Sequence, residues 1–174
     1  MTKIAEILQQ KIKPKEKQIR LVEAVVSKKI SAKDFIVFFE PASDVDKGTC
    51  ADAMKHIAAK SPAILIPYID ILVNYINYKA PRVKWGVPEA IGNMAKDYPD
   101  SVVKAIPYLL KNITDDEINT TVIRWCSAFA LTEIAIHNPK TRKQLMPIFE
   151  KLTIEEKNNG VKNVYVKAIK TIEK

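Results

Sequence analysis

The sequence predicts an all-α protein built from helix pairs that stack side by side. Three observations favour this class: apolar residues recur at helical spacing, turn residues are scarce, and a segment repeats after about 40 residues. Only 4 of the 174 residues are glycine and 7% are aromatic, a composition that favours helices over tight hairpins. A chain of this length buries roughly 70% of its unfolded surface, so one domain can hold a core without a metal or a disulfide.

The repeat is clearest between "RVKWGVPEAIGNMA" (82–95) and "VIRWCSAFALTEIA" (122–135), which are related by a shift of 40 residues. The same shift pairs Trp85 with Trp125 and relates the prolines at 67, 107 and 147. An earlier copy, "KGTCADAMKHIAAKSP", fits with a shift of 37, and "VKNVYVKAIKTIEK" resembles the first helix of a further unit. We therefore divide a single domain, 1–174, into N-terminal capping helices (1–42), three repeats (43–80, 81–120 and 121–160) and a terminal half-repeat (161–174).

Capping residues predict where several helices begin. Ser31 with Asp34 caps the run "FIVFF", which we interpret as a helix, although its β-branched and aromatic content would also suit a buried strand. Asn138 and Pro139 have the residue types of an N-cap and a first helical position. Thr114, Asp115 and Asp116 are N-cap candidates for the preceding helix, which should run to about His137. The prolines at 67, 107 and 147 should either kink or restart the second helix of their unit.

These residues also carry a family resemblance. The spacing V-[RK]-x-x-x-[AP]-x-A-[IL]-x-x-[IM], in "VKWGVPEAIGNM" and, with Ile first, in "IRWCSAFALTEI", resembles the first helix of a HEAT repeat, and "IPYLLKNI" resembles the second. The resemblance covers about residues 43–174. It implies a right-handed α–α superhelix, a HEAT-like solenoid of about four stacked helix pairs. Many HEAT units carry an aspartate about six residues before the basic residue; here Tyr78 and Ile118 hold those places.

Residues outside the apolar stripe are the candidates for binding. The stripe itself includes Val83, Val87, Ala90, Ile91 and Met94, which fall on one side of a helical wheel, so a pair of helices must stack on neighbours to cover it. The first candidate surface lies off that stripe and combines aromatic rings with flanking cations: Trp85, Trp125, Phe129, Lys84 and Arg124. Alternatively, the tryptophans pack between successive units and the cations stack over them or cap carbonyls.

A second candidate surface consists of Tyr68, Tyr108, Tyr75 and Tyr78 on the second helices, which line the concave face in HEAT-like proteins. Buried rings whose hydroxyls reach solvent are the alternative interpretation.

Charge and motifs restrict the function. The net charge of +8 is concentrated at the ends, with 9 Lys/Arg against 5 Asp/Glu in residues 1–40 and 10 against 5 in residues 121–174, as expected for solubilising caps of a stacked protein. The sequence has no phosphate-binding glycine loop, nucleophile elbow or zinc-ligand cluster, and Cys50 and Cys126 should be free thiols. Carboxylates in "TDDEI" and "TIEEK" are interpreted as complementing a helix dipole.

We therefore expect a cytoplasmic, non-catalytic protein–protein interaction or scaffold module without a cofactor or metal and without a membrane segment, either a monomer or a weak homodimer. One alternative is a nucleic-acid-binding protein similar to the HEAT-like DNA alkylpurine glycosylases, in which Trp85, Trp125, Lys84, Arg124 and Asp115 would contact DNA. Another is a nucleic-acid-binding solenoid without catalytic activity, which would bind through the basic ends.

Overall fold

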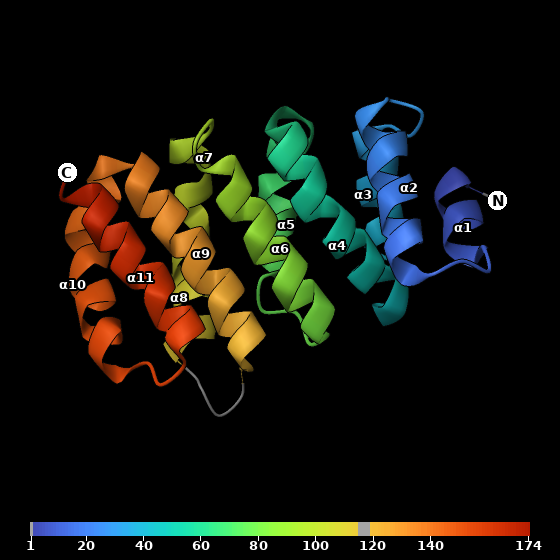
Figure 1. Cartoon of the computed structure of the whole chain (residues 1–174). Coiled ribbons are helices and arrows are strands. Elements are labelled where there is room, and N and C mark those ends of the chain that lie inside the picture. The colour runs from blue at the N-terminus through green and yellow to red at the C-terminus, as the bar shows by residue number, and fades with distance from the viewer. Residues whose placement is uncertain (1, 115–118) are drawn as a thin grey trace.

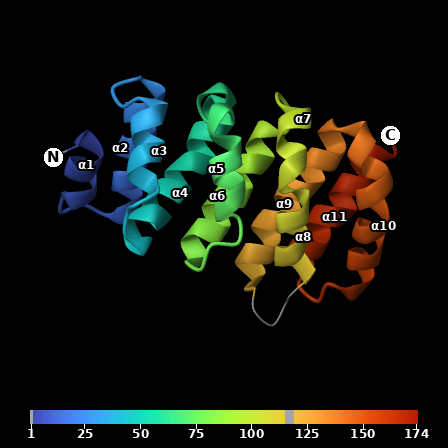
Figure 2. The ribbon, with the colours of Figure 1, turned by 180° about the vertical axis from the view of Figure 1, so that it is seen from behind.

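The computed structural model describes residues 2–114 and 119–174, in which all regular elements are helices. They follow one another in a row with the two termini at opposite ends (Figure 1), and Figure 2 shows the same row from behind. The predicted all-α class is confirmed. The helices are α1 (Lys3–Gln9), α2 (Pro14–Val26), α3 (Ala32–Phe39), α4 (Asp44–Lys60), α5 (Ile69–Tyr75), α6 (Pro81–Met94), α7 (Pro99–Val102), α8 (Ile106–Thr114), α9 (Thr121–His137), α10 (Pro139–Glu155) and α11 (Asn159–Ile172).

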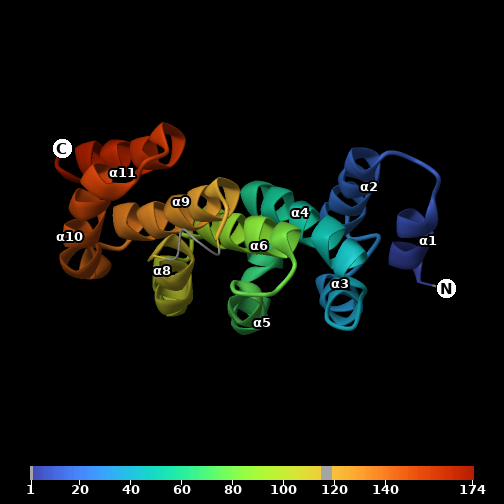
Figure 3. The same ribbon diagram turned by 90° about the horizontal axis from the view of Figure 1, so that it is seen from below.

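The helices form two layers. In Figure 3, α2, α4, α6, α9 and α11 make one layer, and α3, α5, α8 and α10 make the other. Successive first-layer helices pack on one another, α2 on α4, α4 on α6, α6 on α9 and α9 on α11. The core lies between the layers, and the stripe that includes Val83, Val87 and Ile91 is fully buried there. Neighbouring helices thus cover the apolar stripes that one pair leaves open.

Glycines allow the first-layer helices to approach closely. A Cβ at Gly86 of α6 would overlap the backbone of Ala51 in α4. A Cβ at Gly92 would lie 2.7 Å from Cε1 of Phe129, so the phenylalanine ring of α9 lies directly against the backbone of α6. Backbone-to-backbone and ring-to-backbone contacts of this kind exclude side chains larger than hydrogen at the two positions.

Most of the predicted caps are confirmed. The Ser31 hydroxyl accepts a hydrogen bond from the Asp34 N–H and begins α3, so "FIVFF" is helical. Asn138 caps α10 through a hydrogen bond from the Lys140 N–H, and Pro139 is its first residue.

The predicted N-cap at Thr114 is wrong. Thr114 ends α8, and its hydroxyl donates back to the Leu110 carbonyl at 3.0 Å. The N-cap of α9 is Thr120, six residues later. Asp115 and Asp116, the other two candidates, lie outside the described residues.

The three repeated prolines have different outcomes. Pro67 lies in a short 3-10 turn directly before α5, and Pro107 lies in the first turn of α8, so both stand at a helix restart. Pro147 lies inside α10, which continues through it. A proline at this position of the repeat therefore stands at a helix restart in two units and inside a continuous helix in the third.

Candidate functional site

A surface hollow of about 310 Å³ lies between α9 and α11. Its apolar walls come from both helices and include Trp125, Phe129, Ile136, Val164 and Ala168. Polar side chains complete the rim: Thr132, Glu133, Asn163, Lys167 and Thr171, with Gly160 at one end. Ligand pockets span about 300–1,000 Å³, so the hollow has the size for a single anchoring side chain.

Trp125 and Phe129 form the aromatic wall of the hollow. Their ring centroids are 5.8 Å apart and the ring planes differ by 3°, so the rings are stacked. Trp125 remains 37% exposed, whereas Phe129 is half-buried against Gly92. Phe129 therefore fixes the indole in place from the side of α6, and the exposed part of Trp125 is available to a ligand.

The repeat register explains why this hollow is open. A shift of 38 residues pairs Ala130 of α9 with Ala168 of α11, and it places Gly160 and Lys167 where α9 has Val122 and Phe129. Between α6 and α9 the Phe129 ring fills the gap beside Gly92. Between α9 and α11 no aromatic ring takes that role, because lysine stands in its place and glycine replaces valine.

Trp85, the other repeated tryptophan, is in a different environment. It lies on α6 and is half-buried, and its indole Nε1 is buried without a hydrogen-bond partner. No ring contact joins it to Trp125 within the described residues. The two tryptophans share a repeat position on adjacent helices, but only Trp125 is exposed beside a hollow.

Lys84 and Arg124 are bound to neighbouring loops. Lys84 donates to Asn119 Oδ1 at 3.0 Å. The Arg124 guanidinium donates from Nε and Nη2 to the two carboxylate oxygens of Glu156, at 3.0 and 3.1 Å, and from Nη1 to the Asn119 carbonyl at 2.9 Å. The side chains of Arg124 and Glu156 are only 11% and 7% exposed. Both cations thus tie the first helix of their own unit to the segment after its second helix, and the Arg124–Asn119 hydrogen bond also joins two units.

Glu156 is an ionised partner in this pair. Burial by itself would raise the pKa of Glu156, but hydrogen bonds from Arg124 and from the backbone N–H groups of Asn158 and Lys157 outweigh it and hold the pKa below its ordinary value. The helix-dipole interpretation of "TIEEK" is wrong, because Glu155 is the last residue of α10 and Glu156 follows it as the C-cap.

The basic residue of each repeat makes the same kind of bridge. Lys47, Lys84 and Arg124 are related by the shifts of 37 and 40. The Lys47 ammonium donates to the carbonyls of Glu40 and Ala42 at 2.6 and 2.7 Å, and it lies 5.6 Å from the Tyr78 ring centroid. Each cation therefore contacts the segment after the second helix of its own unit, at Tyr78, Asn119 or Glu156. We name these three contacts the intra-repeat bridges.

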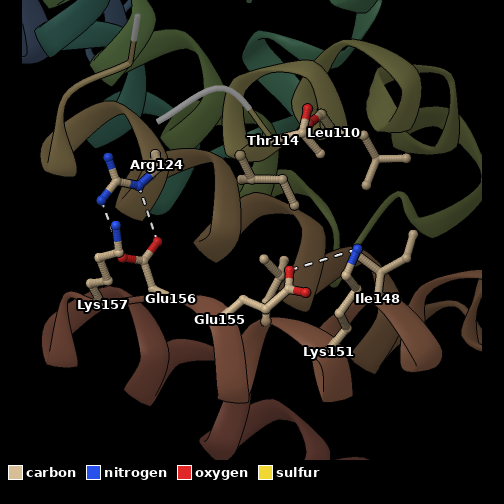
Figure 4. Close-up of a pocket in the computed structure, with 10 residues that line it drawn as sticks. Leu110, Thr114, Arg124, Ile148, Lys151, Glu155, Glu156 and Lys157 are labelled. Carbon is tan, nitrogen blue, oxygen red and sulfur yellow. Dashed lines mark hydrogen bonds and ion pairs between the residues drawn. The ribbon is translucent and has the colours of Figure 1, made fainter. Parts of the chain in front are cut away.

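A second hollow, of about 440 Å³, lies between α8 and α10 (Figure 4). Leu110, Ile113, Ile148 and Leu152 supply its apolar lining. The rim is ionic, with the Arg124–Glu156 pair at one side and a Lys151–Glu155 pair at 3.6 Å at the other. Most of its charged rim is already paired, and it contains no aromatic side chain.

The tyrosines of the second candidate surface lie in different environments. Tyr108 lies on α8 and is exposed, whereas Tyr68 lies before α5 and packs partly on the core. The Tyr78 hydroxyl donates to Asp44 Oδ1 at 2.8 Å, and this hydrogen bond to a carboxylate raises the pKa of Tyr78. Neither Tyr68 nor Tyr108 lines either of the two hollows described above.

The described residues contain no group of three or more His, Cys, Asp or Glu side chains placed to hold a metal ion. Asp115, which the glycosylase alternative requires, lies outside those residues. No helix in the described ranges is both long and apolar enough to cross a bilayer.

Comparisons with known proteins support the fold only. No protein-family model matches the chain, and no curated protein sequence matches it. Two crystal structures of engineered proteins from the Northeast Structural Genomics Consortium are similar to it, each with a TM-score of 0.74. One shares 16% sequence identity and covers 98% of this chain and 79% of its own; the other shares 14% and covers 99% and 80%. At these identities the similarity indicates a common helical architecture and carries no information on activity.

Proposed function

We propose that this chain is a non-catalytic, HEAT-like helical-repeat module that binds a protein partner through the hollow between α9 and α11. The supporting observation is the exposed Trp125, held by Phe129 at the edge of a hollow that fits one anchoring side chain. Tryptophans beside apolar pockets are typical centres of protein–protein interfaces. The buried, unpaired Cys50 and Cys126 are compatible with a reducing cytoplasm, where we place the protein.

The nucleic-acid alternative has less support in the contacts. Lys84 and Arg124, the cations that were expected to face DNA, donate to Asn119 and Glu156 instead. Phosphate binding by these residues would require breaking these contacts. The protein-binding proposal uses only groups that the fold leaves accessible.

A selection experiment tests the proposal. The purified protein is used to select binders from a random peptide library, and the affinities of the selected peptides are measured by fluorescence anisotropy. We expect Trp125→Ala to weaken binding about 30-fold, the effect of losing a hot-spot residue worth about 2 kcal/mol. Tyr108→Ala is the matched control, because Tyr108 is a similarly exposed aromatic residue outside the hollow.

Two results would overturn this proposal. Peptides that bind with unchanged affinity to Trp125→Ala would show that the hollow is not the binding site. Peptides that depend on Tyr108 instead would place binding on the second-layer helices. Circular dichroism of each variant establishes that the loss of affinity is not a loss of fold.

A further inference from the structure

The wall of the hollow that α11 supplies is positively charged. Lys167 lines the hollow, and Lys170 follows it at a spacing of three residues, which places both on one side of α11. Both side chains are exposed, and neither makes a hydrogen bond or ion pair within the described residues. We name them the lysine row. The glutamate nearest in sequence, Glu173, follows the end of α11, so α11 itself carries no acidic side chain.

The opposite wall carries a single acidic side chain among the residues that line the hollow. Glu133 of α9 lies 3.4 Å from His137 Nε2, one helical turn away, so its carboxylate is directed along α9. The lysine row brings two positive charges against this one negative charge, so the net charge beside the hollow is positive.

We propose that the hollow binds an acidic protein segment that inserts one large apolar side chain beside Trp125 and pairs its carboxylates with the lysine row. This inference rests on the proposed function and adds the chemistry of the partner. The apolar walls and the volume of about 310 Å³ favour a large apolar side chain as the anchor. The lysine row favours acidic side chains in the residues that follow this anchor.

Two other occupants fit the hollow less well. A second copy of this chain has a net charge of +8 and would bring like charge to the lysine row. A single strand of nucleic acid binds by stacking successive bases on successive aromatic rings. Here the stacked Phe129 covers one face of Trp125, and the remainder of the hollow is lined by aliphatic and polar side chains.

The test uses three synthetic, fluorescently labelled 12-residue peptides and measures their binding by anisotropy. The first is rich in glutamate with one central phenylalanine, the second has alanine for the phenylalanine, and the third has lysine for each glutamate. We expect only the first peptide to bind, with at least a tenfold loss of affinity between 50 and 500 mM salt. The double variant Lys167→Glu, Lys170→Glu should weaken it at least tenfold.

A matched double variant, Lys33→Glu with Lys143→Glu, changes the net charge equally at exposed positions outside the hollow. Its affinity for the acidic peptide should stay within about twofold of the wild-type value. Comparing the two double variants therefore separates the effect of the lysine row from that of the overall charge of the protein. Equal losses in the two double variants would overturn the proposal.

Other outcomes separate the two proposals. Equal binding of the lysine-rich peptide would refute the acidic preference, while Trp125-dependent binding of peptides from the random library would leave the proposed function standing. If the library also yields no Trp125-dependent peptide, the proposed function itself is wrong. An oligothymidine strand that binds in a Trp125-dependent manner and displaces the acidic peptide would replace both proposals with a nucleic-acid function.

Discussion

Arg124→Met should strongly destabilise the fold, although Arg124 is next in sequence to the exposed Trp125. Two charge-assisted hydrogen bonds join Arg124 to Glu156, and both side chains are about nine-tenths buried. Removing one partner of such a pair costs about 3–5 kcal/mol, because the other charge stays buried. With about 3 kcal/mol as the lower limit, and about 2–4 °C lost per kcal/mol in a protein of this size, the melting temperature should fall by about 6–12 °C.

The assay is urea unfolding followed by circular dichroism at several pH values. The pKa of Glu156 in the folded protein lies below its ordinary value of 4.5, so the stabilisation from the pair is fully present above about pH 4.5. It is lost as the pH falls through the lowered pKa and Glu156 takes up a proton. The stability difference between the wild type and Arg124→Met should therefore be constant near neutral pH and should shrink as the pH becomes acidic. The decrease should begin above pH 4.5, because burial raises the pKa of Glu156 once Arg124 is removed, and it should continue as Glu156 of the wild type takes up its proton.

A double-mutant cycle provides the control. Glu156→Leu should cost a similar amount, and Arg124→Met combined with Glu156→Leu should cost less than the two single changes added together, because no buried charge is left alone. If each single substitution costs less than about 0.5 kcal/mol and the two costs are additive, the reasoning is refuted, because exposed ion pairs contribute in that range.

Three further predictions concern the packing of the repeats. Gly86→Ala should lower the free energy of unfolding by about 1–3 kcal/mol in urea titrations, because its Cβ would overlap the Ala51 backbone; a change below about 0.5 kcal/mol would contradict the close approach. Lys47→Met should cost about 2–3 kcal/mol in thermal unfolding, since two carbonyls lose their donor, while Lys33→Met on the surface should be neutral; equal effects would argue against the bridge. Cys50 and Cys126 should resist iodoacetamide at pH 8 until urea is added, because burial raises the pKa of both thiols to about 12; rapid alkylation of the folded protein would show that the thiols are accessible.

The fold could be predicted because the apolar stripe is a local pattern. Val83, Val87 and Ile91 lie at helical spacing, and all three are fully buried in the core. The N-cap at Thr120 was missed, although the repeat contains the signal. The shifts of 37 and 40 relate Ser43, which caps α4, to Ala80 and then to Thr120.

The candidate site could be predicted only in part. Trp125 and Phe129 were recognised from their place off the stripe, and both line the hollow. Glu156 was missed as the partner of Arg124, because the two residues are 32 positions apart and the equivalent contacts of Lys47 and Lys84 use an aromatic ring and an amide. A repeat search finds residues that are the same, whereas these acceptors differ in chemical type from unit to unit.

The intra-repeat bridges have a consequence for engineering. Lys47 is matched to an aromatic cluster, Lys84 to an amide and Arg124 to a carboxylate, so the bridge contacts differ in chemistry although their geometry is shared. Exchanging or duplicating whole units would move each cation together with its acceptor, because both lie in one unit. Replacing only the first helix of a unit would separate the two, so a rearranged chain should keep each unit whole.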